Sequence, residues 1–110
     1  MKRVFITGGC GYCGSVLVPK LLKLGHNVTV LDTQWFGNNL PIHKNLVVFK
    51  VSILDRGCVD EGMDGMDAVI HLAGVANDPC GELNPKLTWE TNALGTFLLA
   101  QSAVKHKVKQ

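Results

Sequence analysis

The sequence predicts an α/β fold in which a parallel sheet carries helices on both faces, and three observations favour it. An apolar run at 4–6 leads into a loop with four glycines, and a helical pattern follows at 15–24. A second apolar run at 27–31 follows that helix and ends at Asp32. Apolar runs and helical patterns then keep alternating along the chain, as a parallel sheet with crossover helices requires.

The first β-α-β unit follows from the spacing of its apolar residues. Continuous apolar character at 2–7 and 27–31 is typical of strands that are buried on both faces. Between them, apolar residues recur at helical spacing over 15–24, and Gly25 follows where a left-handed C-terminal residue is expected. Pro19 lies in the second turn of this helix, where we expect a mild kink and no break.

The middle of the chain repeats the alternation. Turn-forming residues at 33–45 predict a loop, and the apolar run at 46–51 predicts a third strand. Asp55 can cap a short helix that ends near Glu61, and a fourth strand is expected at 68–72.

A second loop, at 74–85, leads to the last predicted helix, at about 86–106. Its apolar residues are expected near one face: Leu87, Leu94, Phe97, Leu98 and Val104. The basic segment 105–109 is interpreted as the solvated end of this helix.

Right-handed crossovers place the four strands in the order 3-2-1-4. The predicted fold class is therefore a Rossmann-type doubly wound parallel sheet, truncated after its fourth strand, in a single domain that spans 1–110. A ligand is expected at the reversal between the first and fourth strands, beyond their carboxyl ends.

Composition excludes several classes of function. The formal net charge is +2 and the only concentration of basic residues is at 105–109, so no basic stripe suited to nucleic acid is present. No apolar run approaches the roughly 20 residues that cross a bilayer, and the apolar stretch near the N-terminus is too short for a secretory signal. We therefore expect a cytoplasmic protein without nucleic-acid or membrane partners.

The four cysteines, Cys10, Cys13, Cys58 and Cys80, are expected to be free thiols, because nothing in the sequence indicates export. Cys10 and Cys13 form a C-x-x-C pair before a helix, which leaves a thiol redox protein as an alternative. Cys58 and Cys80 stand alone without a histidine at ligand spacing, so no metal site is predicted.

The glycine loop is the main candidate for function. Gly8, Gly11 and Gly14 let the backbone turn sharply without a Cβ, and the first N–H groups of the following helix then face an anion such as a pyrophosphate. Asp32 stands near the roughly 20-residue offset at which a carboxylate meets a ribose. This combination of strand, glycine loop, helix and acid predicts a dinucleotide-binding site.

Four segments together resemble the extended short-chain dehydrogenase/reductase family, the NAD-dependent epimerases and dehydratases of nucleotide sugars. They are the glycine loop 7–14, Asp32, the segment 69–74 and the segment 92–96, and the resemblance covers the whole chain. It implies that the N–H groups of Tyr12 and Cys13 bind the pyrophosphate and that Asp32 binds the adenosine ribose. NAD is expected rather than NADP, because a carboxylate repels a 2′-phosphate and no cation follows it.

Other cofactor contacts are implied by the resemblance alone. The family usually has an aspartate and an aliphatic residue at the adenine edge, where this chain has Ser52 and Ile53. A serine hydroxyl binds more weakly than a carboxylate, so this contact differs from the family pattern. Asp55, just beyond, can equally be a helix cap.

The resemblance also implies that Leu72, Ala73 and Gly74 line the nicotinamide ribose side of the cofactor, and that Asn92 helps to order the active site. His71 is expected to be a strand histidine whose hydrogen bonds are satisfied within the fold.

The family's chemistry uses a tyrosine four residues before a lysine. The one tyrosine here is Tyr12 in the glycine loop, and position 16 is a valine, so no catalytic residue is predicted. The fourth strand would be left as an apolar edge, which predicts a fragment of a longer enzyme or self-association through that edge.

Our leading hypothesis is the N-terminal NAD-binding part of a nucleotide-sugar epimerase or dehydratase, whose complete form transfers a hydride to NAD and back. The alternative is a non-catalytic NAD-binding module.

Overall fold

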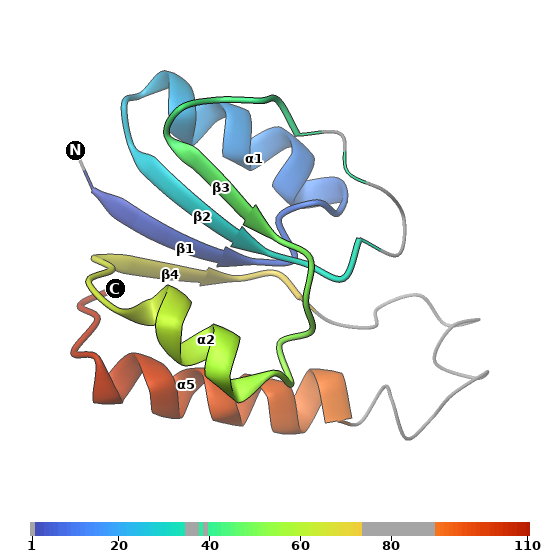
Figure 1. The fold of residues 1–110 in the computed structure, drawn as a ribbon, viewed down its shortest axis with the longest axis vertical. Coiled ribbons are helices and arrows are strands. Elements are labelled where there is room, and N and C mark those ends of the chain that lie inside the picture. The colour runs from blue at the N-terminus through green and yellow to red at the C-terminus, as the bar shows by residue number, and fades with distance from the viewer. Residues whose placement is uncertain (1, 35–37, 39, 74–89) are drawn as a thin grey trace.

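The computed structural model describes residues 2–34, 38, 40–73 and 90–110. Strands and helices alternate along the chain as the sequence predicts (Figure 1). The elements are β1 Arg3–Thr7, α1 Tyr12–Lys23, β2 Asn27–Leu31, β3 Leu46–Phe49, α2 Arg56–Met63, β4 Ala68–His71, a π-helical turn Glu90–Leu94 and α5 Gly95–Lys105.

The four described strands form one parallel sheet in the order β3-β2-β1-β4, which confirms the predicted topology. Thr7 pairs in register with Leu31 of β2 and with His71 of β4, so these three strands reach the same edge of the sheet together. The segments that follow them are thereby gathered at the reversal between β1 and β4, where the sequence places the ligand.

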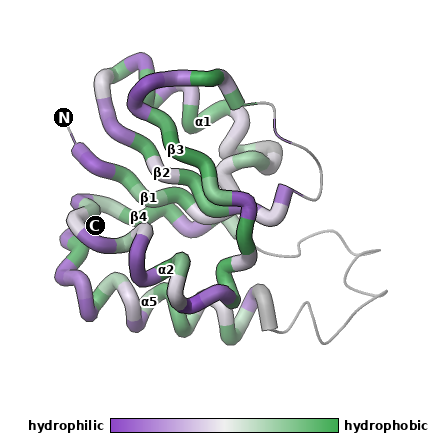
Figure 2. Tube along the Cα trace, in the orientation of Figure 1, coloured by the Kyte–Doolittle hydropathy of each residue, from purple (hydrophilic) through white to green (hydrophobic). Residues whose placement is uncertain are grey.

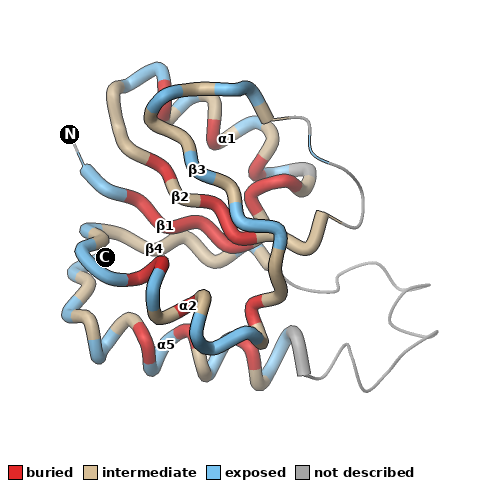
Figure 3. The backbone as a smooth tube through the Cα atoms, in the orientation of Figure 1, coloured by how far each residue is buried: buried red, intermediate tan, exposed pale blue. Residues whose placement is uncertain are grey.

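Successive side chains of β1 point to opposite faces and build two cores. Ile6 packs toward α1, where it meets Val18, while Phe5 packs toward α2 and α5, where it meets Met63 and Leu99. Helix α1 therefore covers one face of the sheet, and α2 and α5 cover the other (Figure 1). The buried residues concentrate along β1 and β2, in the middle layer (Figure 3).

Some predicted boundaries move by a few residues. Helix α1 begins at Tyr12 and not at residue 15, because Gly11 with its extended backbone is already the N-cap. The helix continues through Pro19 as predicted. Asp55 caps α2 by accepting the N–H of Cys58, as predicted, and α2 runs on past Glu61 to Met63. The third and fourth strands end at 49 and 71, short of the predicted 51 and 72.

The apolar residues predicted near one face of the last helix do not form its buried face. Phe97 is 58% exposed and Val104 is 78% exposed, whereas Gly95, Leu99 and Ser102 are buried. Two of the three buried residues are small or polar, which allows α5 to pack closely but hides its inner face from a count of apolar residues. Residues 86–89, with Leu87, lie outside the described part of the chain.

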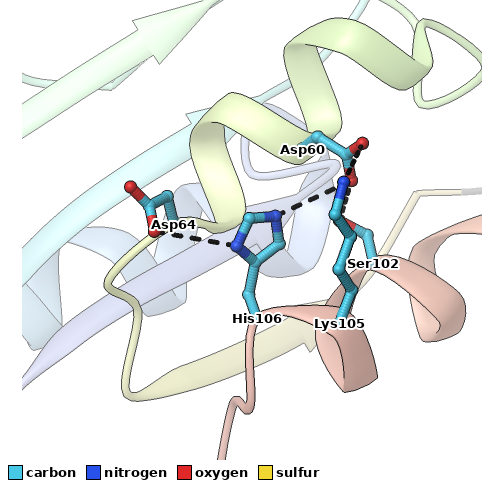
Figure 4. A network of polar contacts seen from close by, with 5 residues as sticks. All are labelled: Asp60, Asp64, Ser102, Lys105 and His106. Carbon is cyan, nitrogen blue, oxygen red and sulfur yellow. Dashed lines mark hydrogen bonds and ion pairs between the residues drawn. The ribbon is translucent and has the colours of Figure 1, made fainter.

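A polar network joins the end of α5 to α2 (Figure 4). The hydroxyl of buried Ser102 donates a 2.6 Å hydrogen bond to Asp60, and Lys105 lies 3.4 Å from the same carboxylate. The ring of His106 lies between Asp60, at 3.8 Å, and Asp64, at 3.7 Å. The bond from Ser102 is the main cause that lowers the pKa of Asp60. The polar side chains at the end of α5 therefore hold this helix against α2.

The C-terminal residues lie beside the outer edge of β4. The N–H of Val69 donates to the carbonyl of Gln110 at 2.8 Å, and the side chain of Gln110 accepts from Lys2 at 2.6 Å. The end of the chain is hydrophilic (Figure 2), and Lys107 and Lys109 are exposed as predicted, whereas Val108 between them packs against the core that contains Phe5. One backbone N–H on the outer edge of β4, that of Val69, is therefore hydrogen-bonded within the chain. Self-association through β4 stays a prediction.

In the part of the chain that the structure describes, no helix has both the length and the apolar character to cross a membrane.

We predict that Ser102→Ala makes the protein more sensitive to acid. The lowered pKa of Asp60 means that its ionised form stabilises the fold above the pKa of the unfolded chain, and that this stability is lost as the pH falls through the folded pKa. Without the hydroxyl of Ser102, the pKa of Asp60 should rise and the acid unfolding midpoint should move to higher pH. Circular dichroism against pH measures the midpoint, with Gln101→Ala on the exposed side of α5 as the control. An unchanged midpoint in Ser102→Ala would contradict this.

Candidate functional site

The glycine loop connects the end of β1 to the start of α1, and Gly8 is where the backbone turns. Gly8 has a φ of +73°, a conformation that side chains disfavour. Its N–H donates to the carbonyl of Leu31 at 2.8 Å, and a Cβ at this position would lie 2.6 Å from the backbone nitrogen of Ala73. Gly8 is therefore required by the fold itself, because the end of β1 and the segment after β4 pass too closely for a side chain.

Gly14 and Gly11 are glycines for different reasons. A Cβ at Gly14 would collide with the backbone of Gly9, so Gly14 is needed for the first turn of α1 to pack on the loop. A Cβ at Gly11 would meet a single described atom within ordinary contact distance, the carbonyl oxygen of Gly8 at 3.4 Å. The described residues leave room beside the Cα of Gly11, which suits the approach of a ligand.

The N-terminus of α1 is open to an anion. Gly11 is its N-cap and supplies no side-chain hydrogen bond, and the first turn carries no acidic residue. The N–H groups of Tyr12 and Cys13 lie in this uncapped first turn, where the helix dipole favours negative charge. The structure thus places both predicted pyrophosphate ligands at a fitting position.

Asp32 lies at the end of β2 and joins the glycine loop to the next turn. One carboxylate oxygen accepts the N–H of Cys10 at 2.9 Å, and the other accepts the N–H of Gln34 at 2.6 Å. A carboxylate oxygen can accept more than one hydrogen bond, so both oxygens are held in place and can still accept from a ligand.

Cys10 is a poor candidate for redox chemistry. Its side chain is buried, and burial together with the charge of Asp32 raises the pKa of its thiol to about 11. Because the thiolate is the reactive form, the C-x-x-C pair lacks an activated thiol at Cys10. Cys10, Cys13 and Cys58 are free, and Cys80 lies outside the described residues.

Ser52 and Ile53, predicted at the adenine edge, follow β3 and are held by the fold. The hydroxyl of Ser52 accepts the N–H of Leu54 at 3.1 Å and keeps its own proton available for donation. The side chain of Ile53 is buried in the core with Met63.

Across the described residues, the structure brings together no group of three or more side chains that could hold a metal ion.

The segment after β4 lies against the end of β1. The N–H of Leu72 donates to the carbonyl of Thr7 at 2.9 Å, and the N–H of Ala73 donates to the hydroxyl of Thr7 at 3.3 Å. Gly74 lies outside the described residues. Asn92 is exposed within the π-helical turn Glu90–Leu94.

The side chain of His71 is hydrogen-bonded at both ring nitrogens. Nδ1 lies 2.6 Å from the hydroxyl of Thr7, and Nε2 lies 2.8 Å from the hydroxyl of Thr96. Burial lowers the pKa of His71. The expectation that this histidine is satisfied within the fold is confirmed. Sequence reasoning assigned no role to either threonine, although both lie in segments that carry the resemblance, 7–14 and 92–96.

Comparison with known proteins places this site in a family. The profile of the NAD dependent epimerase/dehydratase family matches residues 4–110. A UDP-N-acetyl-alpha-D-glucosaminuronate decarboxylase of Bacillus cytotoxicus is 35% identical over 98% of this chain and 35% of its own length. The chain therefore spans about a third of the length of that relative.

Solved structures agree with the sequence match. UDP-glucose 4-epimerase of Thermus thermophilus, crystallised with NAD, is 31% identical with a TM-score of 0.85, over 97% of this chain and 35% of that chain. The Bordetella bronchiseptica enzyme WbmG, in complex with NAD and UDP, is 32% identical with a TM-score of 0.88, over 98% of this chain and 35% of that chain.

The predicted resemblance and the predicted Rossmann-type fold are thereby confirmed, and so is NAD as the cofactor on which the family depends. Since the family profile matches nearly the whole chain and the sheet has the same topology that the glycine loop predicts, this chain belongs to the NAD-dependent epimerase/dehydratase family.

Proposed function

We propose that this chain is the N-terminal, NAD-binding part of an enzyme that converts a nucleotide sugar by transferring a hydride to NAD and back. The observation that carries the proposal is that two groups suited to different parts of one dinucleotide lie beside the same loop. The uncapped start of α1 suits a pyrophosphate, and the anchored carboxylate of Asp32 lies beside the same loop, bonded to Cys10.

Some residues of the glycine loop would contact the pyrophosphate, and others maintain the conformation of the loop. The N–H groups of Tyr12 and Cys13 would bind the pyrophosphate, and the bare Cα of Gly11 lets the phosphates come close to the backbone. Gly8 and Gly14 hold the loop in the shape that aims these groups.

The adenosine half would be held by Asp32 and by the residues after β3. With both oxygens already oriented by backbone N–H groups, Asp32 would accept the two ribose hydroxyls with little loss of side-chain entropy. Ser52 and the backbone of Ile53 would contact the adenine edge, with the hydroxyl of Ser52 as a donor because it already accepts from Leu54.

The nicotinamide half would lie toward Leu72, Ala73 and Gly74. Asn92 would help to order the active site next to it. When bound, NAD supplies the hydride acceptor, and this chain's residues bind and orient it. The groups that move protons on the sugar lie outside this set, since Tyr12 is the one tyrosine of the chain and stands in the loop.

The names of the relatives, a decarboxylase and an epimerase of UDP-sugars, support a UDP-sugar substrate for the complete enzyme. The hydride transfer proposed here would make its reaction that of an isomerase or an oxidoreductase. We further place the protein in the cytoplasm, which the three free thiols among the described residues support.

Replacing Asp32 should weaken NAD and change cofactor preference. In Asp32→Asn the charge that repels a 2′-phosphate is gone and the ribose hydroxyls lose charged acceptors, so the Kd for NAD should rise at least about tenfold. The ratio of the NADP Kd to the NAD Kd should fall toward one. Isothermal titration with both cofactors measures this, with Glu61→Gln on exposed α2 as the control. A preference for NAD that survives in Asp32→Asn would refute the assignment.

Filling the space above Gly11 should block NAD without unfolding the chain. In Gly11→Val the backbone conformation is allowed and the added side chain points into space that no other described residue fills, so the melting temperature should change little. The Kd for NAD should rise by at least about tenfold, because the phosphates can no longer approach. Gly57→Ala on α2, which has ordinary contacts, is the matched control. Full NAD affinity in folded Gly11→Val would exclude this loop as the phosphate site.

A further inference from the structure

One line of hydrogen bonds runs from the end of β1 to the start of α5. The hydroxyl of Thr7 accepts the N–H of Ala73 at 3.3 Å and lies 2.6 Å from Nδ1 of His71. Nε2 of the same ring lies 2.8 Å from the hydroxyl of Thr96, which donates to the carbonyl of Asn92 at 2.7 Å. The line thus connects residues from three separate parts of the chain.

Which group donates and which accepts in each hydrogen bond follows from the groups at the two ends of the line. The carbonyl of Asn92 can only accept, so the single hydroxyl proton of Thr96 is used there, and Nε2 of His71 must donate to Thr96. Burial lowers the pKa of His71, which favours the neutral ring, and Nδ1 is then without a proton. The hydroxyl of Thr7 therefore donates to Nδ1, and every proton in the line has one position.

The three segments that this line joins all contain residues of the proposed NAD site or adjoin them. Thr7 immediately precedes the glycine loop, Ala73 belongs to the segment after β4, and Asn92 lies in the π-helical turn that leads into α5. Single π-helical turns are rare and occur often at functional sites. Thr7 is fully buried, its bonds to His71 and Ala73 are partly buried, and the bond from His71 to Thr96 lies at the surface.

We propose that His71 is a positioning residue, which in its neutral form with the proton on Nε2 holds the start of α5 against the glycine loop and so sets the nicotinamide side of the NAD site. This inference rests on the proposed function. His71 acts through Thr7 and Thr96 and needs no contact with the cofactor. A merely structural histidine would instead affect all ligands of the site equally.

The test compares NAD with ADP, which has the adenosine and the pyrophosphate but lacks the nicotinamide half. In Thr96→Val, the Kd for NAD should rise about three- to tenfold, as for the loss of one hydrogen bond, while the Kd for ADP changes less than about twofold. Thr96→Ser keeps the hydroxyl and should keep the wild-type ratio of the two constants. Isothermal titration of the full chain measures both.

Two variants of His71 separate its two bonds. Asn places an acceptor near the position of Nδ1, and Gln places a donor near that of Nε2, so each keeps one bond and loses the other. Both His71→Asn and His71→Gln should lower the preference for NAD over ADP. The matched control is His26→Gln, because Nδ1 of His26 also accepts a hydrogen bond, in its case from the backbone N–H of Lys2, but His26 lies at the opposite end of the strands.

The tautomer can be read on the wild-type chain without any substitution. The ¹⁵N chemical shifts of the His71 ring at neutral pH should show a bare Nδ1 and a protonated Nε2, and a charged ring or the other tautomer would overturn the proposal. Equal weakening of NAD and ADP in Thr96→Val, or no weakening, would also overturn it. If the wild-type chain binds no NAD, both the inference and the proposed function fail, whereas a wild type that binds NAD with an unaltered ratio in the variants removes the inference alone.

Discussion

The close approach of two backbone segments at the end of β1 is the constraint on which the rest of the structure depends. Gly8 bonds to the carbonyl of Leu31 on one side, and on the other side its Cα faces the backbone of Ala73 with no room for a Cβ. Because three parallel strands end level at this point, their following segments converge on one small volume. A dinucleotide site at this edge is a consequence of that convergence.

Asp32 shows how a residue can serve the fold and a ligand together. Its two oxygens accept N–H groups from Cys10 and Gln34, which ties the end of β2 to the glycine loop. The same charge, with burial, raises the pKa of the thiol of Cys10, so the cysteine next to the proposed phosphate site is held in its unreactive form. This suits the proposed role of the loop in binding a pyrophosphate and argues against thiol chemistry at Cys10.

The two layers of helices have different tasks. Helix α1 presents its N-terminus to the site and packs its apolar face on the sheet through Val18. Helix α5 begins at the site, where Thr96 bonds to His71, and ends at the polar network of Asp60. Its position is thus determined at both ends by hydrogen bonds, and in the middle by Leu99 in the core.

The sequence by itself determined the alternation of strands and helices, the strand order, the glycine loop and the place of Asp32, because local periodicity and the handedness of crossovers encode them. It could not reveal which face of α5 is buried, since Gly95 and Ser102 pack closely without being apolar. Only the tertiary structure decided that Gly14 serves packing while Gly11 leaves room for a ligand, and that His71 bridges Thr7 and Thr96. The contacts of His71 join residues far apart in the chain, and the roles of the two glycines depend on the exact path of the loop, so neither follows from sequence spacing alone.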